Sequence, residues 1–125
     1  MARLCEVTPI PIALDEELIG VNDLSRKQEL LEKVHPQYII LKPALCGGFS
    51  GATEWIRLAG EFQIGWWVTS ALESNIGLNA LAQWVATLGT TLPQGLGTGQ
   101  LFTNNMAVPL RQVGGKLCYE PSEEK

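Results

Sequence analysis

The sequence predicts an α/β protein with about four parallel strands, three helices and a C-terminal β-hairpin. Short apolar segments end at residues 15, 42, 69 and 98, so their ends are separated by 27, 27 and 29 residues. A helical pattern lies in each interval. Strands that alternate with helices at this spacing are typical of βαβ units, which form a parallel sheet.

The predicted strands are apolar on both faces, as strands buried within a parallel sheet usually are. They span Ile10–Asp15, Tyr38–Lys42, Ile64–Thr69 and a weaker segment, Gly95–Thr98. The predicted helices carry apolar residues at helical spacing. They span Arg26–Val34, with Ser25 as a possible N-cap, then Ser50–Phe62, and finally Ser74–Leu88, which ends at Gly89.

The alternation stops after the fourth strand. Two short segments, Pro109–Val113 and Lys116–Tyr119, flank the pair Gly114-Gly115. Glycines between two strand-like segments favour a tight turn, so this region is predicted to form a β-hairpin.

Length and composition indicate one domain over residues 1–125, with enough apolar residues (46%) to bury a core. A net charge of −4 argues against a nucleic-acid partner and against anionic membrane surfaces. No apolar run approaches the roughly 18 residues of a membrane span. Three widely spaced cysteines indicate free thiols in a reducing cytoplasm. With a single histidine, His35, a zinc site or a His-activated nucleophile is disfavoured.

Lys42 is the first candidate functional residue. It ends an apolar strand and precedes Pro43, and a charge at that position is costly unless it projects into a polar site. The glycine pair that follows, Gly47-Gly48, lets backbone pass close to a ligand. In α/β proteins the carboxyl ends of the strands are where sites are built.

Other polar residues end the remaining strands. Right-handed crossovers would bring these ends to one rim of the sheet. The Asp15 carboxylate can ligate a hard cation such as Mg²⁺, and the Lys42 ammonium can transfer protons or stabilise negative charge. The remaining candidates at this rim are Thr69, Ser70, Gly97 and Thr98.

Each candidate also has a purely structural interpretation. Asp15 could simply place negative charge at the start of a solvated turn, and Lys42 could extend from the sheet end into water. Thr69 and Ser70 could cap a helix, with Glu73 closing a capping box on Ser70. The aligned placement of several such residues is what favours a site.

Four segments carry a resemblance to a known family. They are PIALDEELIG (11–20), YIILKPALCGGFSGA (38–52), GWWVTSALESNIGLNALA (65–82) and LPQGLGTGQLF (92–102). Together they resemble the carboxyl-terminal half of the barrel domain in the o-succinylbenzoate synthases of the enolase superfamily. The resemblance covers nearly the whole chain, and the combined order of D-E-E, L-K-P, T-S-x-x-E-S and G-L-G-T is specific.

The resemblance implies a partial (β/α) barrel and a lyase reaction in menaquinone biosynthesis. In such enzymes Mg²⁺ assists proton abstraction next to a carboxylate, and water is then eliminated. Asp15 would be the last of three acidic metal ligands, and Lys42 would stabilise the enediolate as a cation. Thr69, Ser70, Gly97 and Thr98 would contact the carboxylate or succinyl arm of the small-molecule substrate, with Gly48 beside them.

The chain also departs from that family. We find no K-x-K motif, no two further strand-end acids and no capping domain before Asp15. We therefore expect a fragment that is inactive, or nearly so, in isolation. Four strands cannot close a barrel, so the edges near Ile12 and Leu96 should be exposed and should favour a homodimer or higher oligomer.

Two alternative functions stay open. A racemase, dipeptide epimerase or cycloisomerase of the same superfamily would share the lysine and the acidic metal ligands. A non-catalytic oligomeric α/β module would use the rim residues merely to cap helices. Turnover of the cyclohexadiene substrate separates the catalytic interpretation from the non-catalytic one.

Overall fold

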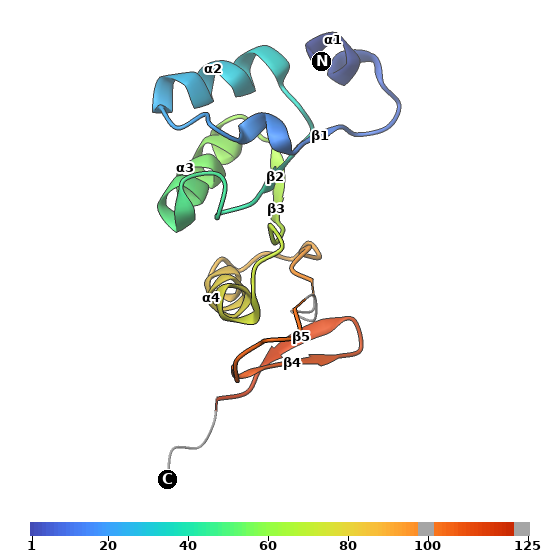
Figure 1. Ribbon diagram of the computed structural model, residues 1–125. Helices are drawn as coiled ribbons and strands as arrows, with labels where there is room; N and C mark the ends of the chain where they lie inside the picture. The colour runs from blue at the N-terminus through green and yellow to red at the C-terminus, as the bar shows by residue number, and fades with distance from the viewer. Residues whose placement is uncertain (98–101, 122–125) are drawn as a thin grey trace.

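The computed structural model describes residues 1–97 and 102–121, and Thr98 lies outside this range. Helices and strands alternate along the chain, and a hairpin follows them (Figure 1). The elements are α1 (Ala2–Val7), β1 (Ala13–Leu14), the 3₁₀ turn η1 (Glu16–Leu18), α2 (Leu24–Val34), β2 (Tyr38–Leu41), α3 (Gly48–Glu61), β3 (Gly65–Val68), α4 (Asn75–Ala86), β4 (Leu110–Val113) and β5 (Lys116–Tyr119).

The central sheet is parallel, as predicted, with the strand order β1-β2-β3 in the described part of the chain. Residue Ile39 of β2 pairs with Leu14 on one side and with Trp66 on the other. The predicted fourth strand is reduced there to an isolated parallel bridge between Thr69 and Gly95. The alternation of strands and helices is therefore confirmed, and the fourth position is occupied by a single bridge.

Strand β1 is shorter than the predicted segment Ile10–Asp15 because prolines precede it. Pro9 and Pro11 have no backbone N–H and cannot donate to a ladder. The next residue, Ile12, donates its N–H to the side-chain Oε1 of Gln37 at 2.8 Å. The Gln37 amide also donates to the carbonyl of Cys5 at 2.8 Å, which ties α1 to the sheet.

Among the described residues, helices cover one face of the sheet and not the other (Figure 1). Figure 1 shows α2, α3 and α4 on the same side of the strands. Ile39, Leu41 and Val68, which point toward these helices, are fully buried. Their neighbours Tyr38, Ile40 and Trp67 alternate to the opposite face and are half-buried. We call this second side, defined by Tyr38, Ile40 and Trp67, the open face.

The core fills the space between the sheet and the helices. Trp55 and Leu58 of α3 are fully buried against it. Removing such apolar surface from water is the main favourable term in folding, about 25 cal/mol per Å². The other core residues are Leu14, Leu18, Leu31, Ile39, Leu41, Cys46, Ala52, Ala59, Ile64, Val68, Leu81 and Val85.

Two predicted helix caps need correction. The N-cap of α2 is Asp23 and not Ser25, whose hydroxyl donates instead to the Asp23 carboxylate. Helix α4 begins at Asn75 with Ser74 as N-cap, so no capping box forms on Ser70. The Glu73 carboxylate bends back instead and accepts the N–H of Ala71 at 2.9 and 2.8 Å.

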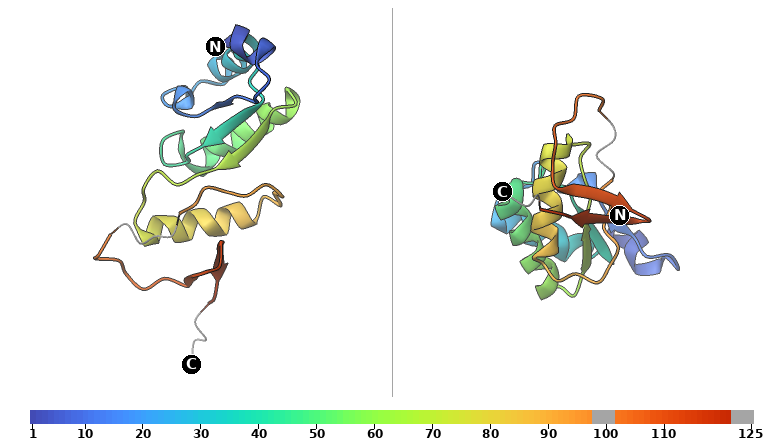
Figure 2. Two further views of the ribbon diagram at one scale, coloured as in Figure 1. Left: turned by 90° about the vertical axis from the view of Figure 1, so that its right-hand side faces the viewer. Right: turned by 90° about the horizontal axis from the view of Figure 1, so that it is seen from below.

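The C-terminal hairpin is confirmed. Strands β4 and β5 pair antiparallel, and Gly114 takes a positive φ of 59° in the turn between them. Figure 2 shows the hairpin at one end of an elongated molecule, beyond α4, with α1 near the other end. Within residues 1–97 and 102–121, no helix combines the length and the hydrophobicity needed to cross a membrane.

Candidate functional site at the carboxyl ends of the strands

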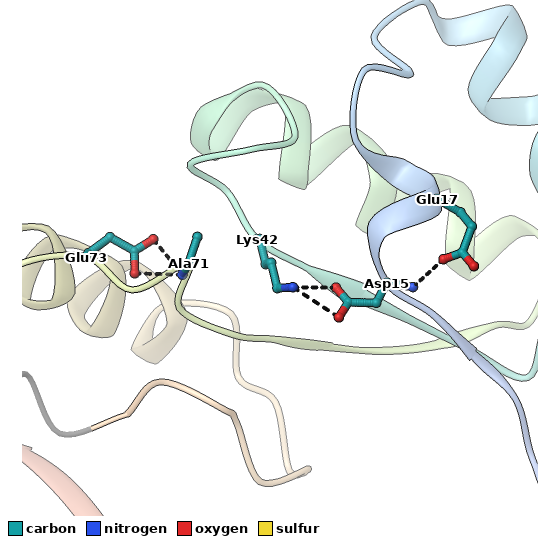
Figure 3. A network of polar contacts seen from close by, with 5 residues as sticks. All are labelled: Asp15, Glu17, Lys42, Ala71 and Glu73. Atoms are coloured by element: carbon teal, nitrogen blue, oxygen red, sulfur yellow. Dashed lines mark hydrogen bonds and ion pairs between the residues drawn. The ribbon is translucent and has the colours of Figure 1, made fainter. Parts of the chain in front are cut away.

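Lys42 and Asp15 form an ion pair at the carboxyl ends of β2 and β1 (Figure 3). The Lys42 Nζ donates to Asp15 Oδ2 at 3.0 Å and lies 2.9 Å from Oδ1. The Lys42 side chain is 20% exposed and that of Asp15 is 38% exposed, so water reaches the pair. Among the described residues, Asp15 Oδ1 has this ionic contact but accepts no hydrogen bond.

Strand geometry explains the meeting of these two side chains. Successive residues of a strand point to opposite faces, so Lys42 lies on the same side as Ile40, which belongs to the open face. Parallel pairing aligns Leu14 with Ile39, so Asp15 lies beside Ile40, two residues before Lys42 and on the same face. The backbone N–H of Asp15 donates to Glu17 Oε2 at 3.0 Å, which holds the turn after β1.

The turn after Lys42 is fixed by its own backbone. The carbonyl of Lys42 accepts hydrogen bonds from Leu45 at 2.8 Å and from Cys46 at 3.1 Å. Gly47 and Gly48 adopt φ values of 93° and 72°, which side chains with a Cβ rarely take. Burial raises the pKa of the Cys46 thiol. Cys46 therefore stays protonated at neutral pH and serves as core.

The end of β3 contributes Thr69 and Ser70. The Thr69 N–H donates to Leu41 at 2.9 Å, and the Ser70 N–H donates to Gly95 at 3.0 Å. These bonds place Thr69 beside Lys42 in the sheet register. The hydroxyl of Thr69 is buried and has no hydrogen-bond partner within the described chain. An unpaired buried hydroxyl is costly, and the described residues supply no partner for this one.

The remaining candidates divide into two groups. Gly97, with φ 74°, lies near Ser70, since a Cβ on it would stand 3.7 Å from the Ser70 Oγ. Gly48 instead lines a separate pocket of about 260 Å³ outside the strand ends, together with Pro43, Ala44, Phe49, Glu73, Gly77, Ala80 and Leu81. The structure thus brings Lys42 together with Asp15 and Ser70 together with Gly97.

Gln94 is a residue at this rim that the sequence pattern did not reveal. Its Oε1 accepts the N–H of Val68 at 2.7 Å, where a fourth strand would supply a carbonyl. Its amide nitrogen donates to the carbonyl of Leu92 at 2.7 Å, which fixes the side chain. A glutamine after Pro93 in a turn carries no signal for this role, since the role depends on the three-dimensional position of β3.

The fit of Mg²⁺ can be tested on these contacts. The oxygen of Asp15 that accepts no hydrogen bond is a ligand of the right type for a hard cation. In the part of the chain that the structure describes, however, no group of three or more His, Cys, Asp or Glu residues could hold a metal. Both oxygens of Asp15 also face the Lys42 ammonium. The described residues alone therefore do not form a Mg²⁺ site.

Comparisons with known proteins show the family and the fold of the chain. The family model described as "Enolase C-terminal domain-like" matches residues 1–117. The o-succinylbenzoate synthase of Desulfotalea psychrophila is 57% identical over 117 residues, which cover 94% of this chain and 32% of that protein. The crystal structure of MenC from Desulfotalea psychrophila LSv54 matches with a TM-score of 0.88 at 57% identity and covers 93% of this chain and 32% of that one.

A more distant structure shares the fold. The L-Ala-D/L-Glu epimerase from Bacillus subtilis matches with a TM-score of 0.79 at 20% identity, over 96% of this chain and 33% of that chain. The predicted partial barrel is confirmed by these matches. The chain spans 32% of the length of the Desulfotalea relative, in its C-terminal part.

Proposed function

The chain belongs to the enolase C-terminal domain-like family, and from this membership we propose that it forms the carboxyl-terminal barrel part of an o-succinylbenzoate synthase. The reaction is the dehydration of a succinyl-hydroxycyclohexadiene carboxylate to o-succinylbenzoate, in menaquinone biosynthesis. The observation that carries the proposal is the Lys42–Asp15 pair at the strand ends, in a chain so similar to the Desulfotalea o-succinylbenzoate synthase.

The proposed role of Lys42 is electrostatic. When a proton leaves the carbon next to the substrate carboxylate, negative charge develops on that carboxylate. A fixed ammonium at the rim stabilises this charge more in the transition state than in the ground state, which is what lowers a barrier. Asp15 holds the ammonium in place through the contacts at 2.9 and 3.0 Å.

The proposed substrate contacts lie beside this pair. The unpartnered hydroxyl of Thr69 supports its role as a donor to the substrate. Ser70 and Gly97, which lie close together, would contact the carboxylate or succinyl arm with Thr98. Gly48 lines a separate pocket and is left out of these proposed contacts.

Mg²⁺ is the proposed cofactor of the complete protein, with Asp15 as one of its ligands. Asp15 Oδ1, which accepts no hydrogen bond among the described residues, supports this assignment. The ion usually takes six oxygens in octahedral array, so further ligands would have to come from outside the described residues. For that reason we propose that residues 1–125 alone are inactive, or nearly so.

Self-association and a cytoplasmic location complete the proposal. The open face carries Tyr38, Ile40 and Trp67, and such an apolar sheet face favours pairing with a second copy. Free thiols at Cys5, Cys46 and Cys118 support a reducing compartment. Light scattering at micromolar concentration should give the mass of a dimer or larger species, and a clean monomer would contradict this part.

A chimera tests the proposed activity. Residues 1–117 replace the matching region of the Desulfotalea enzyme, and dehydration of the cyclohexadiene substrate is followed with Mg²⁺. We expect turnover by the chimera and none by the 125-residue chain alone. Lys42→Ala should lower turnover by about 10²–10³-fold, the usual effect of losing one electrostatic stabiliser.

The control is Lys33→Ala, which removes an exposed lysine of α2 and should leave turnover unchanged. A folded chimera without dehydratase activity would contradict the proposal. Epimerisation of a dipeptide by that chimera would support the racemase and epimerase alternative. Equal activity of Lys42→Ala and Lys33→Ala would support a rim without catalytic function.

A further inference from the structure

Lys27 of α2 is a buried cation that neither the family resemblance nor the proposed reaction uses. It is 2% exposed, and its Nζ lies 2.9 Å from Glu54 Oε1 in α3. The same Nζ donates to the carbonyl of Gly51 at 3.4 Å and stands 5.3 Å from the centre of the Trp55 ring. All of these partners belong to one stretch of α3.

Stability alone does not explain a buried ammonium. Taking the charge out of water is costly, and apolar residues of similar size often serve as well or better at such positions. The partner carboxylate of Glu54 is 33% exposed, so water weakens its compensation. What a buried ion pair can supply is a defined geometry between the groups that it joins.

Gly51, whose carbonyl accepts the hydrogen bond from Lys27, contacts the turn that follows Lys42. A Cβ on Gly51 would stand 2.2 Å from the carbonyl oxygen of Cys46, so these two backbones touch. The N–H of Cys46 in turn donates to the carbonyl of Lys42 at 3.1 Å. The N–H of Gly51 also donates to Gly47 in the same turn at 3.1 Å.

We propose that Lys27 is a positioning residue for Lys42. Its ammonium fixes the first turns of α3 through Gly51 and Glu54, and Gly51 supports the turn of residues 42–48 from which the Lys42 side chain projects. The functional meaning of this role rests on the proposed function of Lys42. The structural coupling does not, and it can be measured without turnover.

The test is amide hydrogen exchange by NMR on the full chain, with Lys27→Met against wild type. We expect the amides of Leu45, Cys46 and Gly48 to exchange about tenfold faster or more, because local opening is set by local contacts. The ¹³C and ¹H shifts of the Lys42 ε-methylene, assigned by Lys42→Arg, should change as well. The amides of β3 and α4 should keep their exchange rates.

Lys33→Met is the matched control, because Lys33 pairs with Glu29 on the exposed side of the same helix. It should leave all of these signals unchanged. Uniform acceleration across β2, β3 and α4 in Lys27→Met, or an unchanged Lys42 ε-methylene, would overturn the proposal.

A milder variant covers the case in which Lys27→Met does not fold. Glu54→Gln keeps the Lys27 contact with Gly51 and removes the charge of the partner. It should accelerate exchange at the same three amides to a smaller extent, and unchanged exchange there would overturn the proposal. If these effects appear while Lys42→Ala leaves turnover of the chimera intact, the proposed function fails and the coupling stands.

Discussion

The ammonium of Lys42 and the carboxylate of Asp15 meet across two adjacent strand ends, with Nζ 2.9 Å from Oδ1 and 3.0 Å from Oδ2. They are separated by 27 residues in the sequence. One βα unit therefore places a cation and an anion side by side on the open face.

The pair should contribute modestly to stability. In a double-mutant cycle of Asp15→Asn and Lys42→Met, we expect a coupling of about 1 kcal/mol or less in the free energy of unfolding, because the pair is partly solvated. The measurement is urea denaturation of the four proteins. A cycle on Glu29→Gln and Lys33→Met, which form an exposed pair on α2, should give a smaller coupling than the Asp15–Lys42 cycle. A larger coupling at Glu29–Lys33 would contradict this ranking.

Two glycines of α3 should respond oppositely to alanine. Gly51→Ala places a methyl group against the Cys46 carbonyl, 2.2 Å away, and should destabilise the chain by about 1–3 kcal/mol. Gly60→Ala meets nothing within 4 Å and should stabilise by up to about 1 kcal/mol, because alanine loses less backbone entropy in a helix. Thermal unfolding of both variants measures the two changes in stability. Equal changes in the melting temperature would contradict a tight contact at Gly51.

Cys46 should add a pH dependence to stability in the alkaline range. Burial raises its pKa above the ordinary value of 9.0, so the folded chain holds the thiol proton to higher pH than the unfolded chain does. Above pH 9.0 the unfolded state therefore loses its proton first, and the free energy of unfolding falls as pH rises through the folded pKa.

The measurement is urea denaturation of wild type and Cys46→Ala between pH 8 and about 10.5, where one proton can contribute at most about 1.4 kcal/mol per pH unit. Cys46→Ala should be less stable at every pH but should lose stability less steeply. Cys118→Ala, at a half-buried position in β5, is the control for general alkaline effects. Identical slopes for wild type and Cys46→Ala would contradict the pKa shift.

The side chain of Gln37 should contribute to stability because it bonds to both α1 and the residue before β1. Gln37→Ala removes acceptor and donor together, leaving the Ile12 N–H and the Cys5 carbonyl without their bonds at 2.8 Å. We expect a loss of about 1–3 kcal/mol in the free energy of unfolding, with faster amide exchange in α1 and β1. Gln83→Ala removes an exposed bond to Asn79 on α4 and should cost less than about 0.5 kcal/mol.

The regular part of the fold could be read from the sequence. Tyr38–Lys42 was predicted as a strand and is found as Tyr38–Leu41, because a continuous apolar run next to proline has few other solutions. Because Asp15 and Lys42 each end a predicted strand, the sequence also predicts that both lie at one rim of the sheet. That inference needed only the right-handed crossover and the parallel register.

The rest depends on contacts that local sequence does not encode. Ser70 looked like a helix cap, but Glu73 satisfies the Ala71 N–H and the helix starts later. Lys27 lies in the polar stretch Arg26–Glu29, and its burial is decided by the packing of α3. The side chain of Gln94 accepts the Val68 N–H in place of a strand carbonyl, and the hydrophobic periodicity of the sequence cannot reveal such a contact.

Because the Gln94 side chain bonds to Val68 where a fourth strand would lie, the two edges of the sheet differ in how easily they can pair with another strand. On the outer side of β3, the carboxyl half is already occupied, since Val68 bonds to Gln94 and Gly95, and Ser70 bonds to Gly95. On the outer side of β1, the backbone of Ala13 alternates away from β2 and pairs with no strand among the described residues. Edge pairing through β1 would join two copies antiparallel and then stop, so it would produce pairs and not fibres.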